Sequence, residues 1–173
     1  MLNPKEYTQI VDENDNIIGK KLRSEITKDD IYRVSSLWVF NQNRELLIAQ
    51  RPMWKKNDPG KWSESAVGTL EFGETYQSNL VKESREELGL DLNENELIFI
   101  GKEFFESPKN RLFGAMYAVI LSNTPKLELN SHEVPYVEWI SNDKIKDELS
   151  EVDNRFVGGF DKFYYQVWKK LYE

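Results

Sequence analysis

The sequence predicts an α/β protein in which helices pack against a β-sheet. Three observations predict this class: short apolar segments with strand-like patterns recur along the chain, two or three segments have helical periodicity, and no linker separates them. The 173 residues also suit the usual size of one domain. We therefore expect a single domain over residues 1–173.

The strands are predicted from aromatic and β-branched runs that polar turns separate. An N-terminal hairpin (about 7–20) is expected because the polar run 12–16 forms a turn between two apolar segments. Residues 21–32 are polar and predict a short helix or a loop. Further extended segments are expected at Val34–Phe40, Leu46–Gln50, Trp62–Leu70, Leu97–Phe105, Leu112–Leu121 and Val134–Ile140.

The helices are predicted from residues that recur at intervals of three and four. Residues 76–88 place Leu80, Ser84 and Leu88 on one face, and Gly89 stands where a helix often ends. A short helix is expected from Asn142 to Leu149. A longer C-terminal helix (about 156–172) carries regularly spaced aromatic residues, and we expect it to pack on its own domain rather than form a dimer contact.

Composition and charge narrow the functional classes. The net charge of −7 argues against a nucleic-acid polymer as partner, because such proteins present basic surfaces. The chain has no cysteine, which excludes disulfides, zinc thiolate sites and a cysteine nucleophile. It shows no signal-peptide pattern and no apolar run of the ~18 residues that a membrane span requires, so we expect a cytoplasmic protein without a membrane partner.

A cluster of acidic residues is the first chemical feature. Glu83, Glu86 and Glu87 stand at positions i, i+3 and i+4 of the predicted helix, so their side chains share one face. Their mutual repulsion would become attraction around a hard divalent cation, for which carboxylate oxygens are suitable ligands. Glu74, beside Gly73, can reach the same ions. Spacing alone nevertheless favours a solvated acidic face.

The segment 68–90 resembles the signature of the Nudix family, G-x5-E-x7-R-E-U-x-E-E-x-G-U, in which U is a bulky aliphatic residue. Seven positions match in register, which makes the resemblance specific: Gly68, Glu74, Glu83, Glu86, Glu87, Gly89 and Leu90. Two positions differ, because Lys82 replaces the arginine and Ser84 replaces an aliphatic residue.

The resemblance implies a Nudix fold with a mixed β-sheet sandwiched between helices (α/β/α) and a hydrolase that uses Mg²⁺ or Mn²⁺. It assigns metal binding to Glu83, Glu86 and Glu87, with assistance from Glu74. It also implies that Gly68 lets its loop approach the metal site. The family's arginine is thought to hold the metal-binding carboxylates, and Lys82 offers a single compact charge instead of a planar fork.

The wider order of motifs resembles the subgroup related to type I isopentenyl diphosphate isomerase. It includes the segments VDENDNIIG, SSLWVF and LLIAQR, and the pair Lys56 and Trp62. The isomerases place a catalytic cysteine and a metal-binding histidine on either side of the glycine that opens the signature. This chain has Val67 and Thr69 there, and its single histidine, His132, lies elsewhere, so hydrolysis is the preferred interpretation.

Basic residues in the loop 51–61 are candidates for substrate binding. Arg51, Lys55 and Lys56 can bind a diphosphate, and Arg51 is the strongest candidate because it follows a strand directly. A solvated charged loop is an equal alternative. Trp54, Phe72 and Tyr76 can stack on a nucleobase, although packing at the core or rim is the favoured interpretation. Phe104, Phe105 and Arg111 are further candidates for the cleft.

Candidates for proton transfer lie in and beyond the signature. Glu86, Glu87 and Lys82 are expected in the catalytic machinery. A glutamate outside the signature often serves as general base in Nudix hydrolases, and Glu133 is the candidate, with Glu106 behind it. A turn glutamate is the simpler alternative for Glu133, and His132 is expected at the surface.

The sequence thus predicts a Mg²⁺-dependent Nudix hydrolase that cleaves the diphosphate of a nucleoside diphosphate linked to another group. The expected partner is a small-molecule diphosphate substrate, a nucleotide derivative, and the sequence leaves monomer and homodimer open. The alternative is a Nudix-fold nucleotide-binding or sensor module with weak turnover, which Lys82 motivates. An isopentenyl diphosphate isomerase-like protein is a minor alternative.

Overall fold

The computed structural model describes residues 6–173, so the first five residues of the predicted domain lie outside it. The strands are β1 (Tyr7–Val11), β2 (Ile17–Leu22), β3 (Ile31–Phe40), β4 (Leu46–Gln50), β5 (Trp62–Ser63), β6 (Ala66–Thr69), β7 (Ile98–Glu106), β8 (Arg111–Ile120) and β9 (Val137–Ile140). The helices are α1 (Tyr76–Leu88), α2 (Asn142–Leu149) and α3 (Phe160–Tyr172), with short 3-10 turns at Arg23–Glu25 and Glu94–Glu96. Within residues 6–173, no helix is long and apolar enough to cross a membrane.

Strand β3 is the centre of a nine-stranded mixed sheet. One edge of β3 pairs in parallel with β8 along its whole length, from Ile31 to Phe40. Along its other edge, from the N-terminal to the C-terminal end, β3 pairs antiparallel with β1, then with β6 and finally with β4. The sheet continues through β2 beside β1, β7 beside β8, and both β5 and β9 beside β4. This arrangement places β6, which leads to α1, directly beside the central strand β3.

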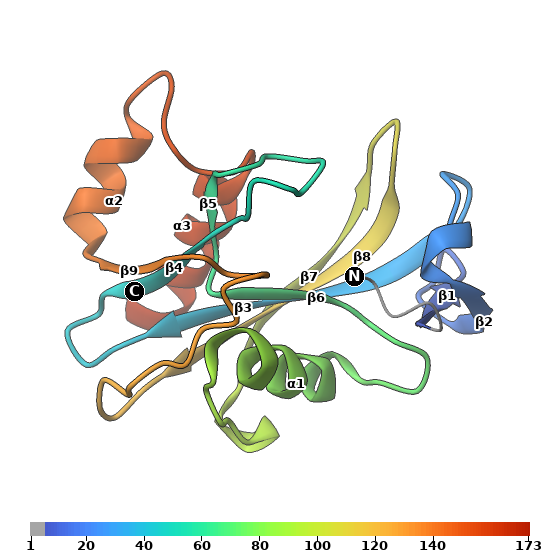
Figure 1. Cartoon of the computed structure of the whole chain (residues 1–173), viewed down its shortest axis with the longest axis horizontal. Helices are drawn as coiled ribbons and strands as arrows, with labels where there is room; N and C mark the ends of the chain where they lie inside the picture. Colours follow the sequence, from blue (N-terminus) through green and yellow to red (C-terminus); the bar gives the residue numbers. More distant parts are fainter. Residues whose placement is uncertain (1–5) are drawn as a thin grey trace.

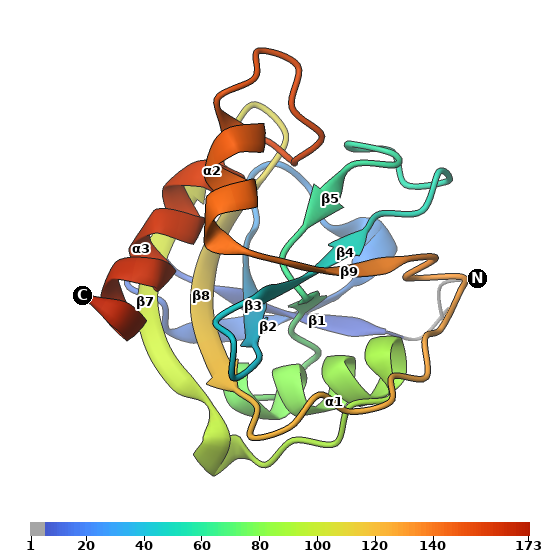
Figure 2. The same ribbon diagram turned by 90° about the vertical axis from the view of Figure 1, so that its left-hand side faces the viewer.

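The two faces of the sheet carry separate hydrophobic clusters because neighbouring side chains on a strand point in opposite directions. Leu37 and Val39 pack in the cluster that also holds Leu80 and Leu88 of α1. Trp38 and Phe40 pack on the other face, among side chains of α2 and α3. Figures 1 and 2 show α1 on one side of the sheet and α2 and α3 on the other, which confirms the predicted α/β/α arrangement.

Helix α1 begins and ends where the sequence predicts. Thr75 is its N-cap, and the Thr75 side chain and that of Ser78 satisfy each other's backbone N–H groups. At the other end Gly89 adopts a left-handed conformation, with φ of 64°. The α1 boundaries position the acidic face relative to the sheet.

Helix α3 differs from the prediction, since it starts at Phe160 rather than near residue 156. Residues 155–157 extend beside β5 instead: Trp62 N–H donates to the Arg155 carbonyl, and Val157 N–H donates to the Trp62 carbonyl. Gly159, with φ of 83°, then turns the chain into the helix. Backbone pairing with a strand distant in sequence therefore overrides the helical periodicity of these residues.

Two predicted strands are also shorter than expected. The segment Trp62–Leu70 divides into β5 and β6, and between them the Ser65 hydroxyl donates to the Leu47 carbonyl at 2.6 Å. The segment predicted from Val134 is a strand only at β9, and it follows a turn over residues 131–133 in which the N–H groups of Glu133 and Val134 donate to the Asn130 carbonyl.

Substitution of Gly89 by alanine is predicted to destabilise the fold. The added Cβ would lie 2.7 Å from Glu128 Cβ, and the left-handed φ would be strained for alanine. The expected loss is about 1–3 kcal/mol, or several degrees in Tm by thermal unfolding. Gly158→Ala is the matched control, since its Cβ meets no atom within 4 Å. Equal Tm values for the two variants would contradict this account.

Candidate functional site

The acidic face of α1 lies directly against β6. A Cβ added to Gly68 would lie 2.5 Å from Glu83 Cγ and would also strike the Asn79 side chain. Only glycine therefore leaves room for Glu83 to pack on this strand. The glycine at the start of the signature thus serves close packing between strand and helix.

Two carboxyl groups on this face are held largely out of water. Burial raises the pKa of Glu83 to about 7, with further contributions from the charges of Glu86 and Glu74, while Lys82 opposes the shift. Burial also raises the pKa of Glu87 to about 8, and the charges of Glu83 and Glu133 act in the same direction. The negative charge of these carboxylates therefore exceeds the positive charge that Lys82 and Lys55 provide at the site.

Lys82 connects the carboxylates of the loop and the helix. Its Nζ lies 2.6 Å from Glu71 Oε1, 2.7 Å from Glu74 Oε1 and 3.9 Å from Glu83 Oε1. Although burial acts to lower it, these hydrogen bonds to Glu71 and Glu74 raise the pKa of Lys82 overall. Lys82 is thus charged and pairs with Glu74 of the signature and with Glu71, while Glu83 lies at a longer distance. Arg85, on another face, pairs with Asp91.

Asn79 is a positioning residue that the sequence analysis missed. It is fully buried, and its Nδ2 donates to Glu74 Oε2 at 2.8 Å and to Glu83 Oε1 at 3.4 Å. Its Oδ1 accepts from the hydroxyl of Ser35 on β3 at 2.5 Å. A polar residue one turn before Glu83, among buried positions of α1, was the available signal.

The second departure from the signature is Ser84, and its hydrogen bonds explain how a polar residue fits there. Its side chain is fully buried, where an aliphatic residue is usual, and its hydroxyl lies 3.1 Å from the carbonyls of both Val81 and Leu90. The hydrogen bonds satisfy the buried hydroxyl group, so the helix keeps its packing against the sheet.

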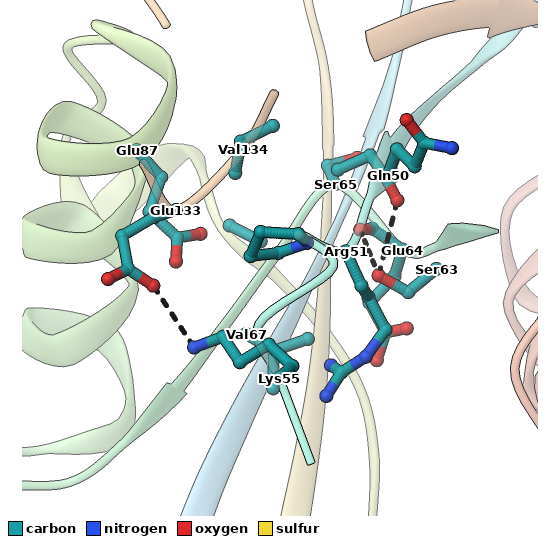
Figure 3. A pocket seen from close by; sticks show the side chains of 13 residues that line it. Gln50, Arg51, Lys55, Ser63, Glu64, Ser65, Val67, Glu87, Glu133 and Val134 are labelled. Carbon is teal, nitrogen blue, oxygen red and sulfur yellow. Dashed lines mark hydrogen bonds and ion pairs between the residues drawn. The ribbon is translucent and has the colours of Figure 1, made fainter. Parts of the chain in front are cut away.

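A polar pocket opens beside the acidic face. It is lined by Glu87, Glu133, Val134 and residues of β4, β5 and β6, together with Arg51 and Lys55. Figure 3 shows Glu87 and Glu133 on one side of this pocket and Arg51 on the other, with Lys55 donating to Glu133 Oε2 at 3.0 Å. Arg51 donates instead to the Asn57 carbonyl. The pocket brings together four of the predicted site residues.

Other predicted residues lie outside this lining. Lys56 is exposed, and Glu106 pairs with Arg111 at the end of β7. Trp54 stacks on His132 with ring centroids 5.0 Å apart, and its indole N–H donates to the His132 carbonyl. This stacking ties the loop 51–61 to the turn that carries Glu133.

A second hollow lies next to the polar pocket, and Glu64 and Val67 line both. The remaining lining side chains of this hollow are mostly apolar: Val34, Ser36, Phe105, Leu112, Gly114, Ala115, Met116 and Phe163. Phe105 was a predicted cleft residue. Glu64 was missed, because its segment has the pattern of an ordinary strand and its surroundings come from distant parts of the chain.

The donor set at α1 consists of carboxylate oxygens, which suit Mg²⁺ or Mn²⁺. Within the described residues, however, no three acidic or histidine side chains converge as closely as a formed metal site requires. Glu86 is exposed, and Glu74 is turned towards Lys82 and Asn79. The assignment of metal ligands stays a prediction, which the donor chemistry and the excess negative charge fit.

Comparison with other proteins agrees with the signature. The model of the NUDIX domain family matches residues 31–158. The chain is 34% identical over 166 residues to an uncharacterised Nudix hydrolase of Clostridium acetobutylicum, covering 90% of this chain and 78% of that protein. It is 32% identical to an uncharacterised Nudix hydrolase of Pseudomonas aeruginosa, covering 75% of each. An isopentenyl-diphosphate Delta-isomerase of Salmonella is 25% identical, over 78% and 77% of the two chains.

Solved structures share the fold. A protein of Deinococcus radiodurans aligns with a TM-score of 0.72 at 21% identity, over 97% of this chain and all of that one. The NUDIX domain of Shewanella oneidensis NrtR, in complex with ADP ribose, aligns with a TM-score of 0.64 at 14% identity, over 81% and 88%. With its matching family model, its relatives and its signature, the chain belongs to the Nudix hydrolase family, pyrophosphohydrolases that act on diphosphate bonds.

Proposed function

We propose that this chain is a Mg²⁺- or Mn²⁺-dependent hydrolase that cleaves a nucleoside diphosphate linked to another group. The observation that carries the proposal is the pair of largely buried carboxyl groups, Glu83 and Glu87, whose charges lack sufficient cations. A divalent cation would supply that charge. Glu83, Glu86 and Glu87 would hold the cation, and Lys82 would hold Glu74 and Glu83 in place.

The polar pocket would bind the diphosphate. When bound, the cation would neutralise the diphosphate and lower the pKa of water. Arg51 and Lys55 line the pocket opposite and beside the carboxylates, so they can attract the phosphate oxygens. Lys56, which is exposed and outside the lining, would act at most on parts of the substrate that project from the pocket.

Glu133 and Glu87 are the candidates for taking the proton of the attacking water. Both line the polar pocket, and the charge of Glu133 acts on Glu87. Lys55 pairs with Glu133 at 3.0 Å, so binding of a phosphate by Lys55 would release this carboxylate for water. The released carboxylate could then accept the proton while the water attacks phosphorus.

Hydrolysis agrees better with the site than isomerisation does. Val67 lies where the related isomerases carry their cysteine, and its side chain cannot donate a proton. His132 is exposed and stacked on Trp54 rather than directed towards a metal site. The Lys82 contacts also weaken the motive for a sensor without turnover, since Lys82 still pairs with Glu74, a carboxylate of the signature.

A release assay tests the proposal. The protein is incubated with a panel of nucleoside diphosphate sugars, dinucleoside polyphosphates and ADP-ribose, with Mg²⁺ or Mn²⁺, and nucleotide products are separated by chromatography. Hydrolysis of at least one compound that stops with EDTA and falls in Glu86→Gln is expected. Absence of product from every compound with either ion would contradict the proposal, and an unaffected Glu86→Gln variant would contradict the metal role.

Lys82 is predicted to be required for turnover although it departs from the signature. Lys82→Met removes the cation between Glu71, Glu74 and Glu83, and kcat/KM should fall by about 10–100-fold, the usual effect of losing a residue that orients metal ligands. Lys82→Arg restores the usual residue and should keep turnover near the parent value. A large gain in rate for Lys82→Arg would instead show that the native site is impaired.

The metal-free protein is predicted to gain stability when Glu87 loses its charge. Because its pKa is raised to about 8, the folded state holds a proton that the unfolded state releases, so the stability contributed by Glu87 is lost as pH rises from about 4.5 to about 8. Glu87→Gln should therefore exceed the parent in Tm at pH 8.5 by at least about 2 °C, and by less at pH 5.

The measurement is thermal unfolding in EDTA at both pH values, followed by the addition of Mg²⁺ at pH 8.5. Mg²⁺ should raise the Tm of the parent more than that of Glu87→Gln. Glu94→Gln, at an exposed position, is the control for loss of one negative charge. An equal Tm difference at pH 5 and pH 8.5 would refute the prediction.

A further inference from the structure

The hollow that Glu64 shares with the polar pocket has no role in the proposed hydrolysis itself. It is formed on the sheet by β3, β6 and β8 and is closed by Phe105 of β7 and Phe163 of α3. We call it the Glu64 pocket. Since Glu64 and Val67 line both hollows, a substrate with its diphosphate beside Glu87 can extend its attached group into the Glu64 pocket.

The walls of the Glu64 pocket suit a flat apolar body. Phe105 and Phe163 meet edge to face with ring centroids 5.4 Å apart. Gly114 lets the Phe105 ring lie close on β8, because a Cβ at this position would be 2.7 Å from Phe105 Cε2. Leu112 and Met116 supply further apolar surface. Aromatic rings and apolar side chains of this kind pack well on a planar ring system.

Glu64 is the charged residue in these walls. Glu64 is half-buried as a residue, and within residues 6–173 its carboxyl group forms no ion pair and no hydrogen bond with another side chain, although its own backbone N–H bonds to it. Burial raises the pKa of Glu64, whereas the charge of Arg51 favours the ionised form. The Arg51 Nε and Nη2 groups donate to the Asn57 carbonyl, so they leave the Glu64 oxygens available to a ligand.

Glu64 does not belong to the metal-binding cluster. Figure 3 shows it across the polar pocket from Glu87 and Glu133. Glu64 lies between β5 and β6, whereas Glu83, Glu86 and Glu87 are carried by α1. A carboxylate in an apolar wall that bonds only to its own backbone N–H is costly, and a ligand with further hydrogen-bond donors would reduce that cost.

We propose that the Glu64 pocket binds the nucleobase of the substrate and that Glu64 selects guanine. This inference rests on the proposed function, whose substrate class it specifies. An ionised carboxylate is acceptor-only, with two oxygens side by side. Guanine presents two adjacent donors, N1–H and the N2 amino group, which match these oxygens. Adenine presents one donor and one acceptor along the same edge, and its acceptor would face a carboxylate oxygen.

An alkyl diphosphate fits this pocket less well. An alkyl chain would pack against the apolar walls. It would also displace water from the Glu64 carboxylate without offering a hydrogen-bond donor in its place. Glu64 would favour a nucleotide over such a substrate.

Binding of nucleotide analogues tests the inference without turnover. The α,β-methylene analogues of GDP, IDP and ADP, and isopentenyl diphosphate, are titrated into the full chain with Mg²⁺ at pH 8 by calorimetry. The GDP analogue is expected to bind at least about tenfold more tightly than the ADP analogue, a difference of about 1.4 kcal/mol. The IDP analogue, which lacks the N2 amino group, should lie between them.

Two variants separate the role of Glu64 from that of the walls. Glu64→Gln presents one donor and one acceptor, so it should abolish or reverse the preference for the GDP analogue over the ADP analogue. Gly114→Ala displaces Phe105, so it should weaken the binding of all three purine analogues. The order of their affinities should stay the same. The control Glu94→Gln should leave every Kd unchanged, since Glu94 is exposed and outside both hollows.

The outcomes distinguish this inference from the proposed function. Equal Kd values for the three purine analogues, an unchanged ratio in Glu64→Gln, or tightest binding of isopentenyl diphosphate would each overturn the inference. If the release assay still shows hydrolysis of a nucleoside diphosphate compound, the proposed function survives that result. If no analogue binds and no compound is hydrolysed, both are wrong.

Discussion

Burial of like charges beside a strand is the constraint on which the site depends. Glu83 and Glu87 lie one turn apart on the inner side of α1, and burial raises the pKa of both. The absence of a side chain at Gly68 permits this close packing, because any Cβ there would collide with Glu83. Burial of these two carboxylates therefore destabilises the metal-free protein. A bound cation would relieve this destabilisation, which would strengthen cation binding.

The surrounding residues limit that cost without removing it. Lys82 bonds Glu71 and Glu74, Asn79 contacts Glu74 and Glu83, and Lys55 bonds Glu133. Lysine in place of the usual arginine therefore still joins the loop to the helix, although through a single nitrogen atom rather than a planar fork. The polar pocket and the Glu64 pocket share Glu64 and Val67 in their linings, so in the proposed function phosphate chemistry and recognition of the attached group would take place in neighbouring hollows.

Much of this arrangement could be predicted from local sequence. Gly89 ends α1 because a left-handed residue is needed there, and the spacing of Glu83, Glu86 and Glu87 places them on one face. The start of α3 could not be predicted, because it depends on pairing between Trp62 and residues 155–157. Glu64 was missed because the residues around it come from distant parts of the chain. Asn79 was missed although Glu74 and Glu83 are near it in the sequence; only its bond with Ser35 depends on a distant strand.

The central claim is that the buried carboxylates of α1 bind a divalent cation. Titration of Mn²⁺ followed by electron paramagnetic resonance tests it most directly, since the signal of the free ion is lost on binding. The account predicts that the parent protein takes up Mn²⁺ and that Glu83→Gln leaves most of it free, while the Glu94→Gln protein behaves like the parent. Uptake by Glu83→Gln as tight as that of the parent would contradict the account.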